Sequence, residues 1–182
     1  KLNKNINDKN MNIVYTFSKI LKISEKSFVN SMKSFRGLPH RFEIFLKKGD
    51  ITFINDSKST SFKASESALY SLKNVYWILG GLPKRNDKFK ILNLKNNIIK
   101  CYLIGNNINF FRNQIKDRIN FSITKNLKNS IIQISKDINL QKRDNKFILL
   151  SPGAASFDQF QNFEQRGEEF KRLCKKYVRK FI

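Results

Sequence analysis

The sequence predicts an α/β fold in which a mostly parallel sheet is covered by helices on both faces. The first observation is that short, continuous apolar runs, such as Val75–Leu79 and Phe147–Leu150, alternate with longer amphipathic segments. Such runs are typical of parallel strands, because the helices that connect those strands bury both faces of the sheet. The second observation is that glycine-rich or polar loops follow these runs, where open α/β sheets bind their ligands.

Two amphipathic helices are expected before this sheet. Within residues 10–21, apolar side chains recur with the spacing of one helix face. Ser24 is a suitable N-cap for a second helix, and Gly37, followed two residues later by a proline, ends the helical pattern. We therefore expect a helical segment over residues 1–37 and a separate domain over residues 38–182.

The second domain is expected to begin with a β-hairpin and to continue as strands alternating with helices. The hairpin is formed by residues 42–46 and 51–54 around a Lys48-Gly49-Asp50 turn. Further strands are expected at residues 75–79, 101–104, 120–123 and 147–150. Helices are expected at residues 64–72, in a stretch ending near residue 115, and at residues 125–138 and 162–180.

The charge balance is strongly basic, with 36 lysines and arginines against 14 acidic residues and a net charge of +22 over 182 residues. This excess suits a polyanionic partner. However, lysine, asparagine and isoleucine are all abundant, and a genome rich in A and T would produce the same bias. The basic residues are spread along the chain without an RNA-recognition or zinc-finger signature, so we do not expect nucleic acid to be the partner. No apolar run approaches the ~20 residues of a membrane-spanning helix, so we expect no membrane contact.

The scarcity of reactive side chains excludes several kinds of site. The two cysteines, Cys101 and Cys174, are far apart, and His40 is the only histidine, so we expect neither a metal centre nor a Ser/His/Asp triad. The chain contains neither a Gly-x-x-x-x-Gly-Lys-Ser/Thr motif for nucleotide phosphates nor a Gly-x-Gly-x-x-Gly motif for a dinucleotide.

Four loops that follow predicted strands carry the side chains of a candidate site. The first combines a carboxylate, an ammonium group and several hydroxyls, the second presents a lysine after two glycines, and the last contains a run of small residues before a helix. A lysine and the free N–H groups of a helix start both suit anions. The loops therefore indicate a pocket for a small molecule that bears carboxylates. They comprise Asn55–Ser61, Gly80–Asp87, Gly105–Asn107 and Ser151–Phe160.

These motifs together resemble one known family. The order and spacing of these segments closely resemble those of the C-terminal part of the D-glutamate-adding family of Mur ligases, over nearly the whole chain. The resemblance implies a Rossmann-like C-terminal Mur ligase domain over residues 38–182, preceded by a helical remnant of the central ATP-binding domain. The segments that carry it are Gly37-Leu38-Pro39-His40-Arg41, Asn55–Thr60, Gly80–Lys84, and Ser151–Phe163 continuing to Arg166-Gly167-Glu168-Glu169-Phe170.

The resemblance also implies an activity. Ligases of this family use ATP and Mg²⁺ to phosphorylate the carboxylate of UDP-N-acetylmuramoyl-L-alanine, and the amine of D-glutamate then attacks the acyl phosphate. The reaction belongs to peptidoglycan biosynthesis in the cytoplasm, and the complete enzyme is expected to be a monomer. The family's P-loop, magnesium-binding residues and modified lysine are expected upstream of Lys1. We therefore expect no catalytic residue and no metal ligand in this chain, and no ligase activity from it alone.

The matching motifs identify candidate site residues. By resemblance, the nucleotide is contacted by Asn7, Asn10, Arg41, Asp56 and Lys58. By the same resemblance, the carboxylates of D-glutamate are held by Thr60, Lys84 and Ser156 and by the backbone around Phe157 and Phe163.

Three other interpretations remain open at this point. A stand-alone, catalytically inactive ligase-like module would pair with another chain, and exposed apolar surface on the first two helices would favour it. A basic nucleic-acid-binding protein would show binding that depends steeply on salt. A ligase for a different amino acid is the third, against which the combination of Lys84 and Ser156 argues.

Overall fold

The computed structural model describes residues 8–89, 94–140 and 144–181, and the chain divides into two compact units. The first unit comprises Lys1–Leu38 and the second comprises Pro39–Ile182. Each unit has its own internal packing and is described separately below.

The first unit is a pair of helices, α1 (Asp8–Ile20) and α2 (Glu25–Ser34), as the amphipathic pattern predicts. Ser24 is the N-cap of α2, and its hydroxyl oxygen accepts a hydrogen bond from the N–H of Ser27 at 3.2 Å. The ring of Tyr15 on α1 packs edge-on against the buried ring of Phe28 on α2, with 5.2 Å between their centroids. This aromatic pair joins the two helices.

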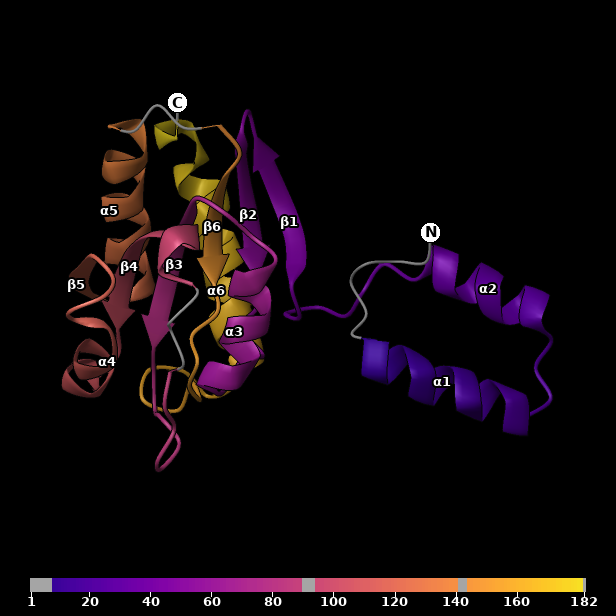
Figure 1. The fold of residues 1–182 in the computed structure, drawn as a ribbon. Helices are drawn as coiled ribbons and strands as arrows, with labels where there is room; N and C mark the ends of the chain where they lie inside the picture. The colour runs from indigo at the N-terminus through magenta and orange to yellow at the C-terminus, as the bar shows by residue number, and fades with distance from the viewer. Residues whose placement is uncertain (1–7, 90–93, 141–143, 182) are drawn as a thin grey trace. The chain divides into compact units, whose positions relative to one another are not determined.

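The described residues of the second unit form a six-stranded sheet (Figure 1). The strand order is β1-β2-β6-β3-β4-β5, and only the β1–β2 hairpin is antiparallel. The prediction of a mostly parallel sheet is therefore confirmed. The strands are β1 (Glu43–Lys48), β2 (Ile51–Asn55), β3 (Val75–Gly80), β4 (Ile98–Ile104), β5 (Phe121–Lys125) and β6 (Lys146–Leu150).

Helices cover both faces of this sheet, which explains the continuous apolar strands. Side chains of β3 alternate between two cores: Trp77 packs with residues of α3 and α4, whereas Tyr76 packs with residues of α5 and α6. None of the described helices has both the length and the apolar content needed to cross a membrane. The helices are α3 (Phe62–Tyr70), α4 (Ile108–Ile115), α5 (Leu127–Asn139) and α6 (Phe163–Tyr177), with single 3₁₀ turns at Lys95–Asn97 and Val178–Lys180.

Several element boundaries differ from the sequence prediction, and two of the differences have identifiable reasons. Strand β4 begins at Ile98 rather than Cys101. Lys100 interrupts the apolar pattern in the sequence, which is why the predicted strand began after it. In the structure its ammonium lies 2.7 Å from the carboxylate of Asp137 on α5, so Lys100 is accommodated within the strand. Helix α5 begins at Leu127 rather than residue 125, because Asn126 is its N-cap and accepts a hydrogen bond from the N–H of Asn129. One polar side chain, Lys100, thus lies within β4, and another, Asn126, sets the start of α5.

The end of β3 depends on a glycine. Gly80 has a φ of +140°, and a Cβ at this position would collide with the carbonyl of Ile104 on β4. The N–H of Gly80 instead donates to the carbonyl of Pro152, beyond the end of β6, at 3.0 Å. The absence of a side chain thus allows the backbone segments at this edge of the sheet to approach closely.

We predict that Gly80→Ala lowers the free energy of unfolding by about 2–4 kcal/mol, because the added Cβ combines a backbone clash with an unfavourable φ. Urea denaturation measures the loss. The matched control is Gly49→Ala in the β1–β2 turn, where φ is also positive (+55°) but nothing lies within 4 Å of the added atom. The control should lose only about 1 kcal/mol, and equal losses for the two variants would contradict this account.

Candidate functional site

The loops that follow β3 and β6 are joined at the carboxyl end of the sheet. The N–H of Leu82 donates to the carbonyl of Ala155 at 2.8 Å, and the N–H of Ala155 donates to the carbonyl of Leu82 at 3.0 Å. This reciprocal pair lies two residues before Lys84 in one loop and directly before Ser156 in the other. The two loops are therefore held as one unit.

The loop after β4 is joined to both of them. The side-chain amide of Asn107 donates to the carbonyl of Gly81 at 3.0 Å, and the carboxylate of Asp158 accepts from the N–H of Asn106 at 2.9 Å. A Cβ on Gly105 would collide with that carboxylate, and Gly105 has a φ of +86°. The structure thus brings together the loops that the sequence predicts to gather at this edge.

Asp56 ties the loop after β2 to the same assembly. Its Oδ2 accepts a hydrogen bond from the hydroxyl of Ser151 at 2.7 Å, and its Oδ1 accepts one from the N–H of Phe42 at 3.1 Å. Burial raises the pKa of Asp56 to about 6, although these hydrogen bonds and the charge of Arg41 favour the ionised form. Because both oxygens are engaged, this carboxylate orders the loop.

A cluster of hydroxyl groups lies beside Asp56. The hydroxyl of Ser65 on α3 donates to the carbonyl of Ser151 at 3.0 Å, and the hydroxyls of Ser59 and Ser65 lie 2.9 Å apart. The indole N–H of Trp77 donates to the same carbonyl of Ser151 at 2.7 Å. All four residues are buried. The polar groups of the loop are thus satisfied within the protein, as burial requires.

Two predicted site residues are in direct contact. The ammonium of Lys58 lies over the ring of Phe163, 3.8 Å from its centroid. The ring of His40 packs edge-on against the same phenylalanine, with 6.0 Å between centroids, and the carbonyl of His40 accepts from the N–H of Lys58 at 3.0 Å. Arg41, the next residue, is exposed. One residue expected at the nucleotide and one expected at D-glutamate therefore share a surface.

The other residues expected at D-glutamate differ in exposure. Thr60 is partly buried and directly precedes Ser61, the N-cap of α3. Lys84 and Phe157 are exposed, whereas Ser156 is buried and its carbonyl accepts from two N–H groups of the next turn. The Leu82–Ala155 hydrogen bonds described above bring the loops of Lys84 and Ser156 together.

The two asparagines expected at the nucleotide belong to the first unit of the chain. Asn10 lies on α1 in the first unit and is exposed. Asn7 lies outside the described residues.

Sequence reasoning missed the central role of Arg166, which it used only as part of a motif. This arginine is 1% exposed. Its Nε donates to the hydroxyl of Ser57 at 3.0 Å, and its Nη2 donates to the carbonyls of Ser57 and Ala154 at 2.8 and 3.0 Å. Nη1 is buried and has no hydrogen-bond partner among the described residues. Burial lowers the pKa of Arg166 to about 10, so the guanidinium stays charged at neutral pH.

A signal for this role is present in the sequence. Arg166 is three residues after Phe163, so both lie on the same side of α6. Gly167 and Phe170 on that helix are also buried. A charged residue among positions that otherwise face the core indicates a side chain with internal partners.

A second polar network fixes the turn that carries Arg41. His40 is buried and has a φ of +61°. Its N–H donates to the carboxylate of Glu43 at 3.0 Å, and Asn55 donates to the same carboxylate at 3.1 Å. The ammonium of Lys171 on α6 lies 3.2 Å from Glu43. A side chain on Gly167 would collide with the His40 ring, so this glycine gives the turn its place against α6.

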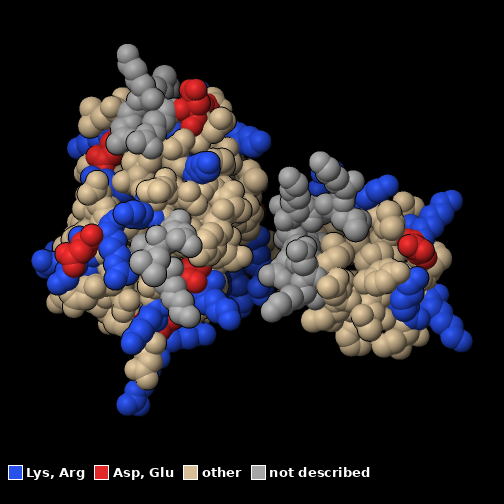
Figure 2. Space-filling model, in the orientation of Figure 1, with Lys and Arg blue, Asp and Glu red and all other residues tan. Residues whose placement is uncertain are grey.

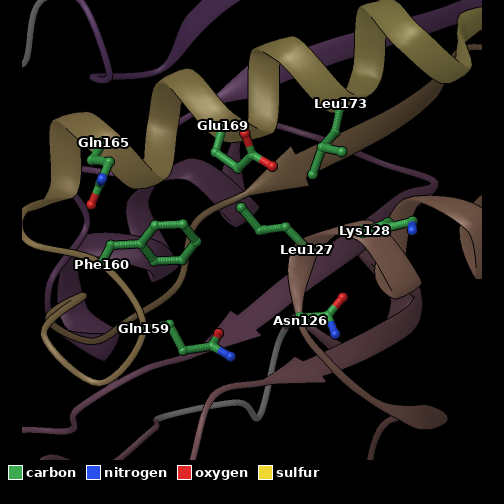
Figure 3. Close-up of a pocket in the computed structure, with 8 residues that line it drawn as sticks. All are labelled: Asn126, Leu127, Lys128, Gln159, Phe160, Gln165, Glu169 and Leu173. Carbon is green, nitrogen blue, oxygen red and sulfur yellow. The ribbon is translucent and has the colours of Figure 1, made fainter.

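A cavity of about 440 Å³ lies elsewhere, between the first turn of α5, the start of α6 and the loop before it (Figure 3). The side chains of Leu127 and Phe160 point toward one another in it, and polar side chains, including Gln159 and Glu169, surround them. Gln159 and Phe160 belong to the predicted loop Ser151–Phe160, but none of the residues expected to contact the nucleotide or D-glutamate is among those that line this cavity. We therefore assign the candidate site to the joined loops.

The described residues gather no metal-binding cluster, and the face drawn in Figure 2 shows no single basic stripe. No group of three or more His, Cys, Asp or Glu side chains that could hold a metal ion occurs within the described ranges. Figure 2 shows lysines and arginines distributed over both units, with acidic residues among them. The charge on this face therefore gives no support to a dedicated nucleic-acid interface.

Comparisons with known proteins identify the relatives of the chain. No family model matches it. A protein from Rickettsia conorii is 36% identical over 176 residues, covering 94% of this chain, and one from Rhizobium meliloti is 37% identical over 148 residues, covering 81%. Both are named UDP-N-acetylmuramoylalanine–D-glutamate ligase. The resemblance to D-glutamate-adding Mur ligases is therefore confirmed. The chain spans about a third of the length of these relatives, 35% and 32% respectively.

Solved structures confirm the fold class. The chain is similar to UDP-N-acetylmuramate–alanine ligase from Thermotoga maritima, with a TM-score of 0.61 and 14% identity over 90% of this chain and 36% of that one. It is equally similar to MurF from Acinetobacter baumannii, with a TM-score of 0.61 and 11% identity over 87% of this chain and 35% of that one. At this identity the likeness shows a shared fold, that of the Mur ligase C-terminal region.

We predict that Asp56→Asn changes the pH dependence of stability. The folded-state pKa of about 6 lies above the ordinary value of 3.8, so the folded chain binds the proton more tightly. Wild-type stability should thus decrease as the pH rises from about 4 to about 6, by up to ~3 kcal/mol. The asparagine can still accept from Phe42 and donate to Ser151, so the variant should lack this decrease.

Urea denaturation between pH 4 and pH 8 measures this difference. The stability of the variant relative to wild type should rise across the interval and level off above pH 6. Asp117→Asn, which changes an exposed carboxylate, is the control and should follow the wild type. A variant-to-wild-type difference that stays constant with pH would contradict the prediction.

Proposed function

We propose that this chain is the part of a UDP-N-acetylmuramoylalanine–D-glutamate ligase that binds D-glutamate. Nearly the whole chain is similar to a segment that makes up about a third of the length of such ligases. The observation that carries the proposal is the reciprocal Leu82–Ala155 hydrogen bonding. It holds Lys84 and Ser156, which belong to different loops, at the carboxyl end of neighbouring strands. In α/β sheets this edge is where small ligands bind.

The chemistry of these residues suits a dicarboxylate. The exposed ammonium of Lys84 provides a mobile positive charge, and the hydroxyls of Thr60 and Ser156 can donate to carboxylate oxygens. The buried guanidinium of Arg166 adds a fixed positive charge beneath the same loops. A negatively charged amino acid would therefore be favoured over a neutral one.

The complete reaction needs components that these 182 residues do not include. ATP would supply the phosphoryl group that activates the carboxylate of UDP-N-acetylmuramoyl-L-alanine for attack by the D-glutamate amine. In this chain Arg41 and Lys58 carry charges that suit the phosphates of ATP, and Asp56 orders the loop of Lys58. The sequence has no P-loop motif and the described residues gather no metal-binding cluster, so nucleotide hydrolysis and Mg²⁺ binding are assigned to another part of the ligase.

We predict that the chain binds D-glutamate and that Lys84→Ala weakens this binding by at least about tenfold, because a charge-assisted contact to a carboxylate is lost. Isothermal titration calorimetry measures both affinities. Lys116→Ala, which removes an exposed lysine from the end of α4, is the control and should bind as the wild type does. Equal affinity for L-glutamate and D-glutamate, or an unchanged affinity of Lys84→Ala, would count against the assignment.

One observation favours a second candidate function, in which the chain acts as a module that pairs with a separate ATP-binding chain. On α1, Ile13, Phe17 and Ile20 are 55–67% exposed, although they form the apolar stripe of the helix. An apolar patch of this kind is typical of a surface that another protein covers. The proposed occupant is a P-loop-bearing domain of a Mur ligase on that separate chain.

This candidate function can be tested by measuring the association of two separate chains. We predict that the part of the Rickettsia conorii ligase that precedes the matched segment binds this chain when the two are mixed. The double substitution Phe17→Ser with Ile20→Ser should weaken the association at least about tenfold, since two apolar side chains lose their burial. Asn12→Ser with Thr16→Ser, which changes exposed polar residues of the same helix, should not weaken it. Sedimentation velocity measures the association, and equal binding by both double variants would exclude this surface.

A further inference from the structure

We infer that Asp87 is a positioning residue for the substrate site: its carboxylate fixes the loop of Lys84 to the first turn of α3, next to Thr60. The N–H of Phe62, the first residue of α3, donates to Oδ2 of Asp87 at 2.9 Å. The inference rests on the proposed function, because it concerns how the residues expected at D-glutamate are held in place.

The start of α3 needs such a partner. The first N–H groups of a helix have no acceptor within the helix, and negative charge near them is stabilising. The N-cap Ser61 accepts from the N–H of Ala64, but the first turn of α3 contains no acidic residue. Asp87, which is 25 residues further along the chain, supplies both the acceptor for Phe62 and the negative charge.

The loop of Lys84 is shaped so that Asp87 reaches this position. The N–H of Asp87 donates to the carbonyl of Lys84 at 3.2 Å, and Asn86 between them has a φ of +61°. Two residues beyond Asp87, the buried ring of Phe89 stacks on the ring of Phe62, with centroids 5.2 Å apart and planes at 28°. A hydrogen bond and an aromatic stack therefore connect the same two segments.

The other end of the loop is fixed to a different segment. At Leu82 the reciprocal hydrogen bonds with Ala155 connect it to the loop of Ser156. Lys84 thus lies between one anchor toward Ser156 and a second anchor, Asp87, toward Thr60. Because both ends of the loop are fixed, Lys84 is held near Thr60 and Ser156 before the ligand binds. The entropy cost of ordering the loop on binding is therefore smaller.

Limited trypsin digestion of the ligand-free 182-residue chain tests the anchor directly. The bonds after Lys84 and Arg85 are exposed cleavage sites within the loop, and mass spectrometry follows each of them. Asp87→Ala should be cleaved there at least about fivefold faster than wild type. Asp87→Asn keeps an oxygen acceptor at the same place and should stay protected. Asp117→Ala, which removes an exposed carboxylate from another loop, should leave the rate unchanged.

Comparing Asp87→Ala with Asp87→Asn separates the loss of the anchor from the effect that the local sequence has on the rate of cleavage by trypsin. Asp87→Ala and Asp87→Asn both remove an acidic residue near the cleaved bonds, so only the lost acceptor distinguishes them. Asp87→Glu keeps the charge but moves the acceptor by one methylene, and it should also be cleaved faster than wild type. If the alanine variant does not fold, the comparison of Asp87→Glu with Asp87→Asn decides the question. Equal protection of the folded Asp87 variants and wild type would overturn the inference.

Titration with D-glutamate tests the consequence for the site. Asp87→Ala should weaken the affinity at least about fivefold while Asp87→Asn restores it, with both variants folded at the temperature of the titration. Unchanged affinity of Asp87→Ala would overturn the positioning role. A wild-type chain that does not bind D-glutamate would contradict the proposed function instead, and the trypsin comparison would still decide whether Asp87 anchors the loop.

Discussion

The buried guanidinium of Arg166 is the interaction on which the arrangement of the site depends. It lies beneath the loops, bonded to the segment after β2 through Ser57 and to the segment after β6 through Ala154. Burying a charge is costly unless hydrogen bonds compensate it, and the carbonyls of both loops turn inward to bind this guanidinium, although its Nη1 has no partner among the described residues. Ser57 and Ala154, which supply these carbonyls, are themselves fully buried. The helix that carries Arg166 therefore also determines the shape of the site.

Around this centre, the site is built from linked loops whose individual contacts are weak. Asp56 connects the loop after β2 with β6, the Leu82–Ala155 pair connects β3 with β6, and Asp87 connects the β3 loop with α3. Each hydrogen bond contributes only about 1 kcal/mol. Together they leave few independent motions at the edge of the sheet, and the glycines there permit the close approach that the bonds require. A rigid edge of this kind suits a site that must hold a small amino acid in one orientation.

The elements of the fold were largely predictable because burial on both faces makes the strands continuous in sequence, as in β3 and β6. Prediction was poorest where a side chain finds its partner far along the chain. Lys100 interrupts an apolar run, and only its pairing with Asp137 on α5 explains why β4 includes it. In the same way, the motif around Lys84 indicates a ligand-binding loop, but nothing local indicates that Asp87 bonds to Phe62. Short-range patterns report periodicity, whereas the contacts that hold the loops together are long-range and polar.

The hydrogen bond between Trp77 and Ser151 has a spectroscopic consequence. Trp77 is the only tryptophan of the chain, it is fully buried, and its indole N–H donates to a carbonyl that belongs to the Ser59–Ser65–Ser151 cluster. The hydroxyl of Ser151 also donates to Asp56, so Ser151 links the indole to a carboxylate whose charge can change. The tryptophan fluorescence of the protein consequently originates beside the loops and not in the first unit. The fluorescence of Trp77 thus reports the polarity of the protein interior directly beneath the candidate site.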